Sequence, residues 1–131
     1  MAKKTKTRLE TWKAAPDLHD FPAAASYLSL LMPDAMAAEL ADRLRTATTG
    51  YWKAKDLLRA SGLARLPETD VHVAGDLSKV ARGEQLSPVL LVRGSATDGR
   101  ALIVADGYHR VCASYSLGED TDIPCRLVDL P

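Results

Sequence analysis

The sequence predicts an α+β fold, in which a small mixed β-sheet is flanked by helices and preceded by a helical N-terminal half. Two observations support this prediction. In the first half of the chain, apolar residues recur at the three- and four-residue spacing of helices that are buried on one side. In the second half, short apolar runs alternate with glycine-containing turns, which is typical of short strands.

Two helices are expected early in the chain. Pro22 favours a helix start, because proline is well tolerated in the first turn, and residues 23–32 are rich in strong helix formers. An apolar stripe that includes Leu40 predicts a second helix over residues 34–46. These helices would supply most of the N-terminal half.

A third helix is predicted over residues 51–61, with Gly62 at its end and a turn over residues 48–50. A short turn between two helices allows two interpretations. The pair is either an ordinary part of the core or a helix-turn-helix that binds DNA. In the second case the phosphate contacts would come from three basic side chains, Lys53, Lys55 and Arg59.

The next element is expected to be a short strand, because Val71-His72-Val73 is β-branched on either side of the histidine. Alternation along a strand would place His72 on the face opposite the valines, which favours a surface or interface histidine. Asp76 is a preferred residue type for a helix N-cap and predicts a short helical turn over residues 77–82.

The remaining elements are three strands and a helix. Residues 88–93 form a nearly continuous apolar run, which predicts a strand that is buried on both faces. A glycine-containing turn joins it to a strand over residues 101–105, so the two form a hairpin. A helix follows over residues 107–117, and a last strand over residues 123–128.

The chain has 131 residues, which suits a single core. We expect one domain over residues 9–131, made of a helical part (9–66) and an α+β part (67–131). Residues 1–8 carry four basic residues and no acidic one, and are expected to form a disordered tail. Without those four, 13 basic residues face 17 acidic ones, so the rest of the chain does not have the composition of a nucleic-acid-binding surface.

Compartment and metal content are predicted from absences in the sequence. No apolar run reaches the length of a membrane span, and the basic N-terminus lacks the apolar stretch of a secretory signal. Both observations favour the cytoplasm. Cys112 and Cys125 lie among apolar neighbours and lack metal-ligand spacing, so we expect buried free thiols and no metal bound by the protein alone.

The candidate site is the run Asp106-Gly107-Tyr108-His109-Arg110, where a strand is expected to give way to a helix. The first amides of a helix are unpaired donors at the positive end of its dipole, and they bind anions such as phosphate. Arg110 in the first turn opposes that dipole, which a bound anion would explain. The alternatives are that Arg110 pairs with a nearby carboxylate and that His109 is a satisfied buried histidine.

Residues 107–113 resemble the Gly-x-x-Arg-x-x-Ala signature of the ParB/sulfiredoxin superfamily, and the preceding runs 76–80 and 86–92 are also similar to it. The resemblance covers roughly residues 70–130. It implies a small nucleotide-binding α+β domain whose ligand phosphates lie at the start of the signature helix. Tyr108 stands where sulfiredoxins carry the reactive cysteine, so their repair chemistry is not expected. ParB proteins follow this domain with a helix-turn-helix domain, whereas this sequence ends at Pro131, so centromere binding and clamp formation in the usual layout are not expected.

The motif and the resemblance together predict a protein that binds a nucleotide or another phosphate-bearing ligand. Gly107 would admit the phosphate, the amides of Tyr108 and its two successors would cradle it, and three cationic side chains would contact it: Lys79, His109 and Arg110. An enzyme of this kind would perform phosphoryl transfer or hydrolysis of a nucleoside triphosphate. Asp106 would then hold Mg²⁺ or act as a base, with His109 as the other catalytic candidate; the alternative for Asp106 is a helix N-cap.

Two other functions stay open at this level. The chain is either a DNA-binding or partition-related accessory protein, acting through the basic tail and the helix pair, or a non-enzymatic interaction module. In the second case the signature would serve only to form the strand–helix junction. The sequence leaves the substrate, any turnover and the oligomeric state undetermined.

Overall fold

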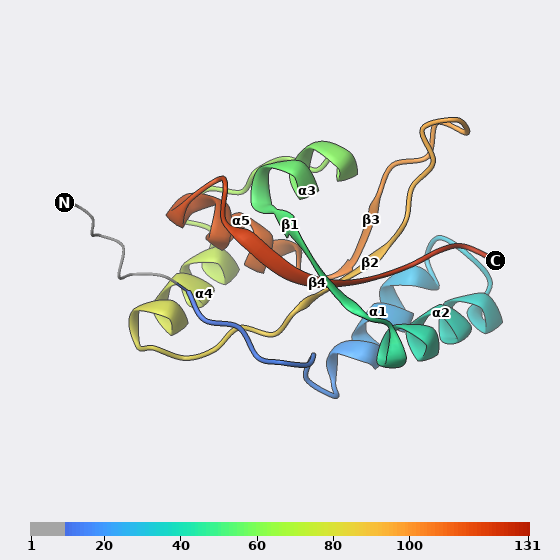
Figure 1. The fold of residues 1–131 in the computed structure, drawn as a ribbon, viewed down its shortest axis with the longest axis horizontal. Coiled ribbons are helices and arrows are strands. Elements are labelled where there is room, and N and C mark those ends of the chain that lie inside the picture. Colours follow the sequence, from blue (N-terminus) through green and yellow to red (C-terminus); the bar gives the residue numbers. More distant parts are fainter. Residues whose placement is uncertain (1–9) are drawn as a thin grey trace.

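The computed structural model describes residues 10–131, and these contain five helices and a four-stranded sheet (Figure 1). The elements in chain order are α1 (Asp20–Leu28), α2 (Asp34–Thr46), β1 (Thr49–Lys53), α3 (Ala54–Ser61), α4 (Val71–Ala81), β2 (Val89–Val92), β3 (Ile103–Asp106), α5 (Tyr108–Leu117) and β4 (Asp122–Val128). This confirms the α+β class. The predicted basic tail lies outside the described residues.

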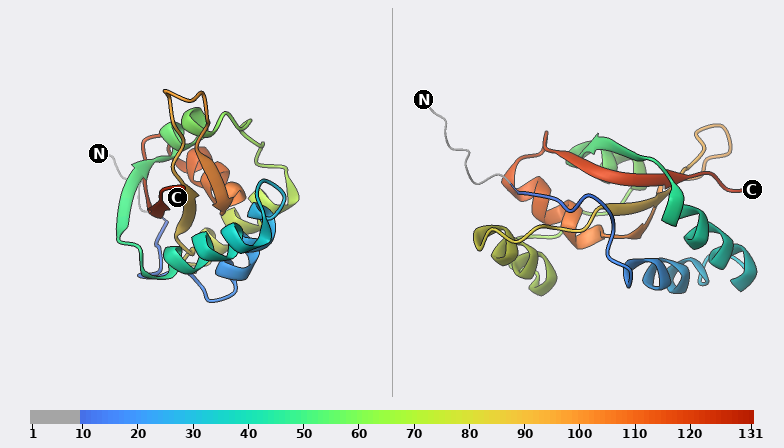
Figure 2. Two further views of the ribbon diagram at one scale, coloured as in Figure 1. Left: turned by 90° about the vertical axis from the view of Figure 1, so that its right-hand side faces the viewer. Right: turned by 60° about the horizontal axis from the view of Figure 1, so that its bottom comes forward.

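The sheet is mixed, as predicted, with the strand order β1-β4-β2-β3. The strand β4 pairs antiparallel with β1 and parallel with β2, and β2 pairs antiparallel with β3. The predicted hairpin of β2 and β3 is therefore confirmed. β1 and β3 form the two edges of the sheet (Figure 2).

Helices cover both faces of the sheet. The buried strand β2 shows this most clearly, because its successive side chains enter different clusters: Val89 and Leu91 pack with residues of α3, α4 and α5, whereas Leu90 and Val92 pack with residues of α1 and α2. All four side chains are at most 1% exposed, which confirms the prediction of burial on both faces. Each cluster combines residues from the 9–66 and 67–131 parts of the chain.

The N-terminal half is not wholly helical, because residues 49–53 form the edge strand β1. They pair with residues 122–126 of β4, so the predicted turn at 48–50 and the helix start at Tyr51 are wrong. Aromatic side chains at two consecutive positions favour a strand where a neighbouring strand is available. The helix α3 begins only at Ala54.

The helix-turn-helix interpretation is also wrong, since β1 separates α2 from α3. The basic side chains assigned to DNA contacts have carboxylate partners instead. The amine of Lys55 lies 2.6 Å from Asp120, and Arg59 lies 3.5 Å from Asp56. Lys53 lies 3.6 Å from Asp122.

The predicted strand at 71–73 is instead the first turn of α4. The cap is Asp70, whose carboxylate accepts hydrogen bonds from the amides of His72 (2.9 Å) and Val73 (3.1 Å). Asp76, predicted as an N-cap, lies inside this helix. A cap satisfies amides that would otherwise be unpaired, and here it outweighs the strand preference of the valines.

Removal of this cap is expected to lower the melting temperature of the protein. The hydrogen bond from the Val73 amide lowers the pKa of Asp70, so the carboxylate stabilises the fold above its unfolded pKa and loses this effect as the pH falls through the lower folded value. We expect Asp70→Ala to lower the Tm by a few degrees at neutral pH, and Asp70→Asn, which can still cap, to preserve it. Equal melting curves for the two variants would contradict the cap.

The rest of the C-terminal half follows the predictions closely. The helix α5 follows β3 directly, and β4 closes the fold. Cys112 and Cys125 are fully buried free thiols, as expected, and burial raises the pKa of Cys125 to about 12. In the described part of the chain, no helix combines the length and the apolar character needed to cross a membrane.

Candidate functional site

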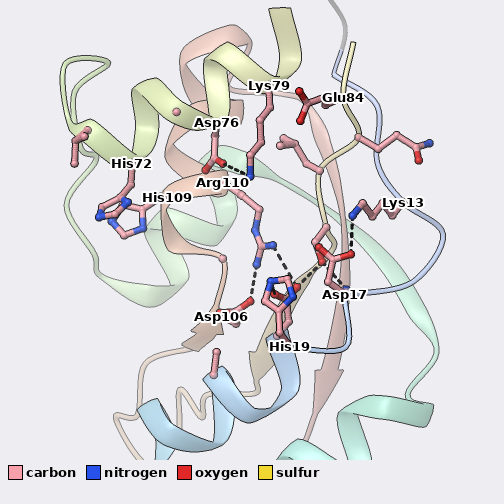
Figure 3. A pocket seen from close by; sticks show the side chains of 18 residues that line it. Lys13, Asp17, His19, His72, Asp76, Lys79, Glu84, Asp106, His109 and Arg110 are labelled. Atoms are coloured by element: carbon pink, nitrogen blue, oxygen red, sulfur yellow. Dashed lines mark hydrogen bonds and ion pairs between the residues drawn. The ribbon is translucent and has the colours of Figure 1, made fainter. Parts of the chain in front are cut away.

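A cavity of about 520 Å³ opens where the end of β3 and the first turns of α1, α4 and α5 meet (Figure 3). Five of the six predicted site residues line it: Lys79, Asp106, Gly107, His109 and Arg110. The sixth, Tyr108, does not line it. Its hydroxyl donates to the carbonyl oxygen of Ala64, and its ring packs against the core beneath α3, α4 and α5.

Arg110 is held between two carboxylates. Its Nη2 lies 2.7 Å from Oδ2 of Asp106, and its Nη1 lies 3.3 Å from Oδ2 of Asp20. Ser87 donates a further hydrogen bond to Asp20. The side chains of Arg110 and Asp20 are only 14% and 5% exposed, so the alternative that Arg110 pairs with internal carboxylates is the one that the structure shows.

This cluster of Asp20, Asp106 and Arg110, called here the carboxylate–arginine triad, joins three elements. Asp20 is the first residue of α1, Asp106 the last of β3, and Arg110 lies in the first turn of α5. The triad fixes the angle at which the strand gives way to the helix, and it ties α1 to that corner.

Gly107 has two structural reasons to be a glycine. Its φ of 108° lies in the region that other residues avoid. A Cβ there would lie 2.8 Å from Nη2 of Arg110 and 3.0 Å from Cγ2 of Val89. The guanidinium therefore occupies the space beside Gly107, and direct contact between Gly107 and a phosphate stays a prediction.

The start of α5 has no side-chain cap. Gly107 is its N-cap residue, so the alternative that Asp106 caps the helix is wrong. The carboxylate of Asp106 pairs with Arg110 instead. Burial raises the pKa of Asp106, although the charge of Arg110 opposes this effect. The first amides of α5 have no acceptor within the helix and lie at the positive end of its dipole.

Two histidines lie side by side at the cavity. The rings of His72 and His109, each the second residue of its helix, have centroids 4.7 Å apart. Sequence reasoning missed His72 because it placed this residue on a strand. Recognition of Asp70 as a cap would have placed it in the first turn of a helix.

Lys79 and Asp76 project from the following turns of α4, with the Lys79 amine 4.0 Å from the Asp76 carboxylate. This separation is at the outer limit of an ion pair, so both groups keep capacity for other partners. Burial raises the pKa of Asp76. Lys79 is half exposed and lines the cavity, and its contact with a ligand stays a prediction.

The cavity lining carries more acidic than basic groups. Its cations are Lys13, Lys79 and Arg110, and its carboxylates are Asp17, Asp20, Asp76, Glu84 and Asp106. With the three lining histidines neutral, the net charge is −2, and with all three protonated it is +1. A bound anion therefore needs protonated histidines or an accompanying cation.

One group of potential metal ligands lies at the edge of the cavity. Ligand atoms of Asp17, His19 and Asp20 lie within 4.8 Å of one another. Both carboxylates already have cationic partners: Asp17 pairs with Lys13 at 2.6 Å, which lowers its pKa, and Asp20 belongs to the triad. These existing partners would compete with a metal ion for the same oxygens.

Comparisons with protein-family models, with curated proteins and with solved structures found no match to this chain. The geometry of the strand–glycine–helix corner and of the cavity beside it is therefore the basis for a functional proposal.

Proposed function

We propose that this cavity binds a phosphate-bearing ligand, and that the ligand is a nucleotide accompanied by Mg²⁺. The observation that carries the proposal is the uncapped start of α5, which opens onto a cavity that also contains Lys79 and His109. Backbone amides at a helix N-terminus, a lysine amine and an imidazole can donate hydrogen bonds to phosphate oxygens.

The triad divides the predicted ligand contacts into two groups. Arg110 stays with its two carboxylates and positions the start of α5. Lys79, His109 and the first amides of α5 then contact the phosphate. Tyr108 takes part through its backbone amide only, because its side chain does not line the cavity: the hydroxyl donates to Ala64 and the ring packs against the core.

The acidic lining favours a ligand that brings a divalent cation. Mg²⁺ prefers carboxylate, water and phosphate oxygens, and it is commonly bound through one or two carboxylates together with the phosphates of a nucleotide. Asp76 fits this role better than Asp106, because one oxygen of Asp106 is engaged by Arg110 at 2.7 Å. Mg²⁺ would neutralise charge on the phosphates, and this chain would position them.

The proposed family is that of ParB/sulfiredoxin-like domains. The support is the Gly-x-x-Arg-x-x-Ala motif, which lies at a strand–glycine–helix junction beside a polar cavity, as the resemblance implied. If the protein turns its ligand over, phosphoryl transfer or nucleotide hydrolysis is the reaction class, with His109 and Asp106 as the catalytic candidates.

Lys79→Ala is expected to weaken nucleotide binding about tenfold, because one charge-assisted hydrogen bond to phosphate is lost. Isothermal titration with ATP, CTP and GTP, each with and without Mg²⁺, measures this. Lys55→Ala is the matched control, since Lys55 of α3 pairs with Asp120 in the loop between α5 and β4 and does not line the cavity. Absence of binding by the wild-type protein, or an equal loss in both variants, would refute the proposal.

A second candidate function is a non-enzymatic interaction module, and the triad favours it, because Arg110 already has a structural role. The substitution His109→Ala separates the two functions. As a ligand contact, His109 is dispensable for folding, so its removal abolishes binding at an unchanged Tm. If His109 has a purely structural role, its removal lowers the Tm, and the wild-type protein does not bind nucleotide.

A further inference from the structure

The pairing of two imidazoles at the cavity indicates a role for His72, a residue outside the motif. We infer that His72 binds the terminal phosphate of the ligand together with His109, and that this binding takes up a proton. The inference rests on the proposed function, since it concerns the same cavity, and it specifies the ligand as one with a terminal phosphate group.

The geometry brings the two rings to one place from distant parts of the sequence. His72 lies in the first turn of α4 and His109 in the first turn of α5, with ring centroids 4.7 Å apart at the wall of the cavity (Figure 3). Lys79 lies two turns further along α4, on the same wall. A terminal phosphate has three unesterified oxygens, and these three side chains offer three donors. A phosphodiester has only two such oxygens.

The other charged or titratable groups around the pair come from four elements. They are Asp70, Asp76 and Lys79 of α4 with its cap, Tyr108 and Arg110 of α5, Asp106 of β3, and Asp20 of α1 with the adjacent His19. The Asp70 carboxylate is engaged by two backbone amides, and Asp20 and Asp106 by Arg110. Of the neighbouring carboxylates, Asp76 therefore has the weakest partner, a lysine 4.0 Å away.

The positions of the two imidazoles couple their protonation to a bound anion. A cation in the first turn of a helix opposes the helix dipole, and two adjacent imidazolium ions repel each other. A phosphate dianion reverses this balance, because each protonated ring can donate a charge-assisted hydrogen bond to it. Binding and protonation are then coupled.

The experiment is isothermal titration of the full chain with Mg²⁺–ATP at pH values from about 5.5 to about 8, in buffers of different ionisation enthalpy. We expect the affinity to fall about tenfold over this range, through the ordinary titration range of histidine. The variant His72→Gln should bind several-fold more weakly than wild type at the acidic end and equally at the alkaline end. Binding to this variant should also take up fewer protons than binding to wild type. Protonation of ATP itself contributes equally to both titrations, so it drops out of the difference between them.

The variant His19→Gln is the matched control, because His19 lines the same cavity but is 81% exposed beside Asp20. It should retain the wild-type pH profile, and all variants should retain the wild-type Tm. If wild type binds and His72→Gln shows the same profile, the role of His72 is refuted while the proposed function stands. If neither Mg²⁺–ATP nor inorganic phosphate binds at any pH, both are refuted.

Discussion

Arg110→Met is expected to destabilise the protein by about 3–5 kcal/mol at neutral pH, because it leaves two largely buried carboxylates without their common cation. Methionine preserves most of the side-chain length, so lost charge rather than lost volume dominates. Urea denaturation measures the change. Arg59→Met is the control, since Arg59 is 80% exposed and its removal should cost at most about 0.5 kcal/mol.

The pH dependence of this variant supplies a second, independent readout. Burial already raises the pKa of Asp106, and loss of the neighbouring cation raises it further. Between the unfolded and the raised folded pKa of Asp106, the folded state holds a proton that the unfolded state has released. The stability of the folded state therefore decreases as the pH rises through this range. The deficit of Arg110→Met should therefore shrink on acidification, as the Asp106 carboxylate becomes neutral.

A third readout comes from removal of one of the two uncompensated charges. Asp106→Asn in the Arg110→Met background should recover part of the lost stability, whereas the same change in the wild-type protein should not stabilise it. A variant Arg110→Met that is as stable as Arg59→Met, with the wild-type pH profile, would show that the triad does not hold this corner.

The triad also changes how binding data on Arg110 must be interpreted. Substitution of Arg110 disturbs the junction of α1, β3 and α5, and with it the cavity wall. Loss of nucleotide binding in such a variant could result from a lost contact between Arg110 and the ligand or from a changed shape of the cavity. Lys79 and His109 are better probes, because neither belongs to the triad.

The elements around α5 were predictable because their signals are local. A four-residue apolar run gives the doubly buried strand β2, and a glycine with helical spacing behind it gives the start of α5. The strand β1 was not predictable in this way, since its five residues form a strand only through pairing with β4 near the other end of the chain.

The residues of the candidate site show the same difference between local signals, which were predictable, and long-range contacts, which were not. The motif residues Asp106 to Arg110 are contiguous, and four of these five line the cavity together. The partner Asp20 lies 90 residues from Arg110 in sequence, and no local pattern marks that pairing. His72 was missed for a different reason, because its two flanking valines indicate a strand unless the cap at Asp70 is recognised.

Gly107→Ala is expected to destabilise the protein by about 2–4 kcal/mol, through backbone strain and overpacking together. The φ of 108° is unfavourable for alanine. The new methyl group would also meet Nη2 of Arg110 at 2.8 Å, and the guanidinium cannot retreat without lengthening its contacts to Asp20 and Asp106. Thermal or urea denaturation measures the change.

Gly75→Ala is the matched control, because Gly75 lines the same cavity but has an ordinary helical backbone and open space around it. In the middle of α4 this change should stabilise the protein by up to about 1 kcal/mol. The double variant with Arg110→Met separates the two causes of the Gly107→Ala effect. Without the guanidinium, the 2.8 Å contact with Nη2 is lost, so the added cost of Gly107→Ala should fall. An undiminished cost would mean that the glycine serves the backbone alone, and not the placement of Arg110.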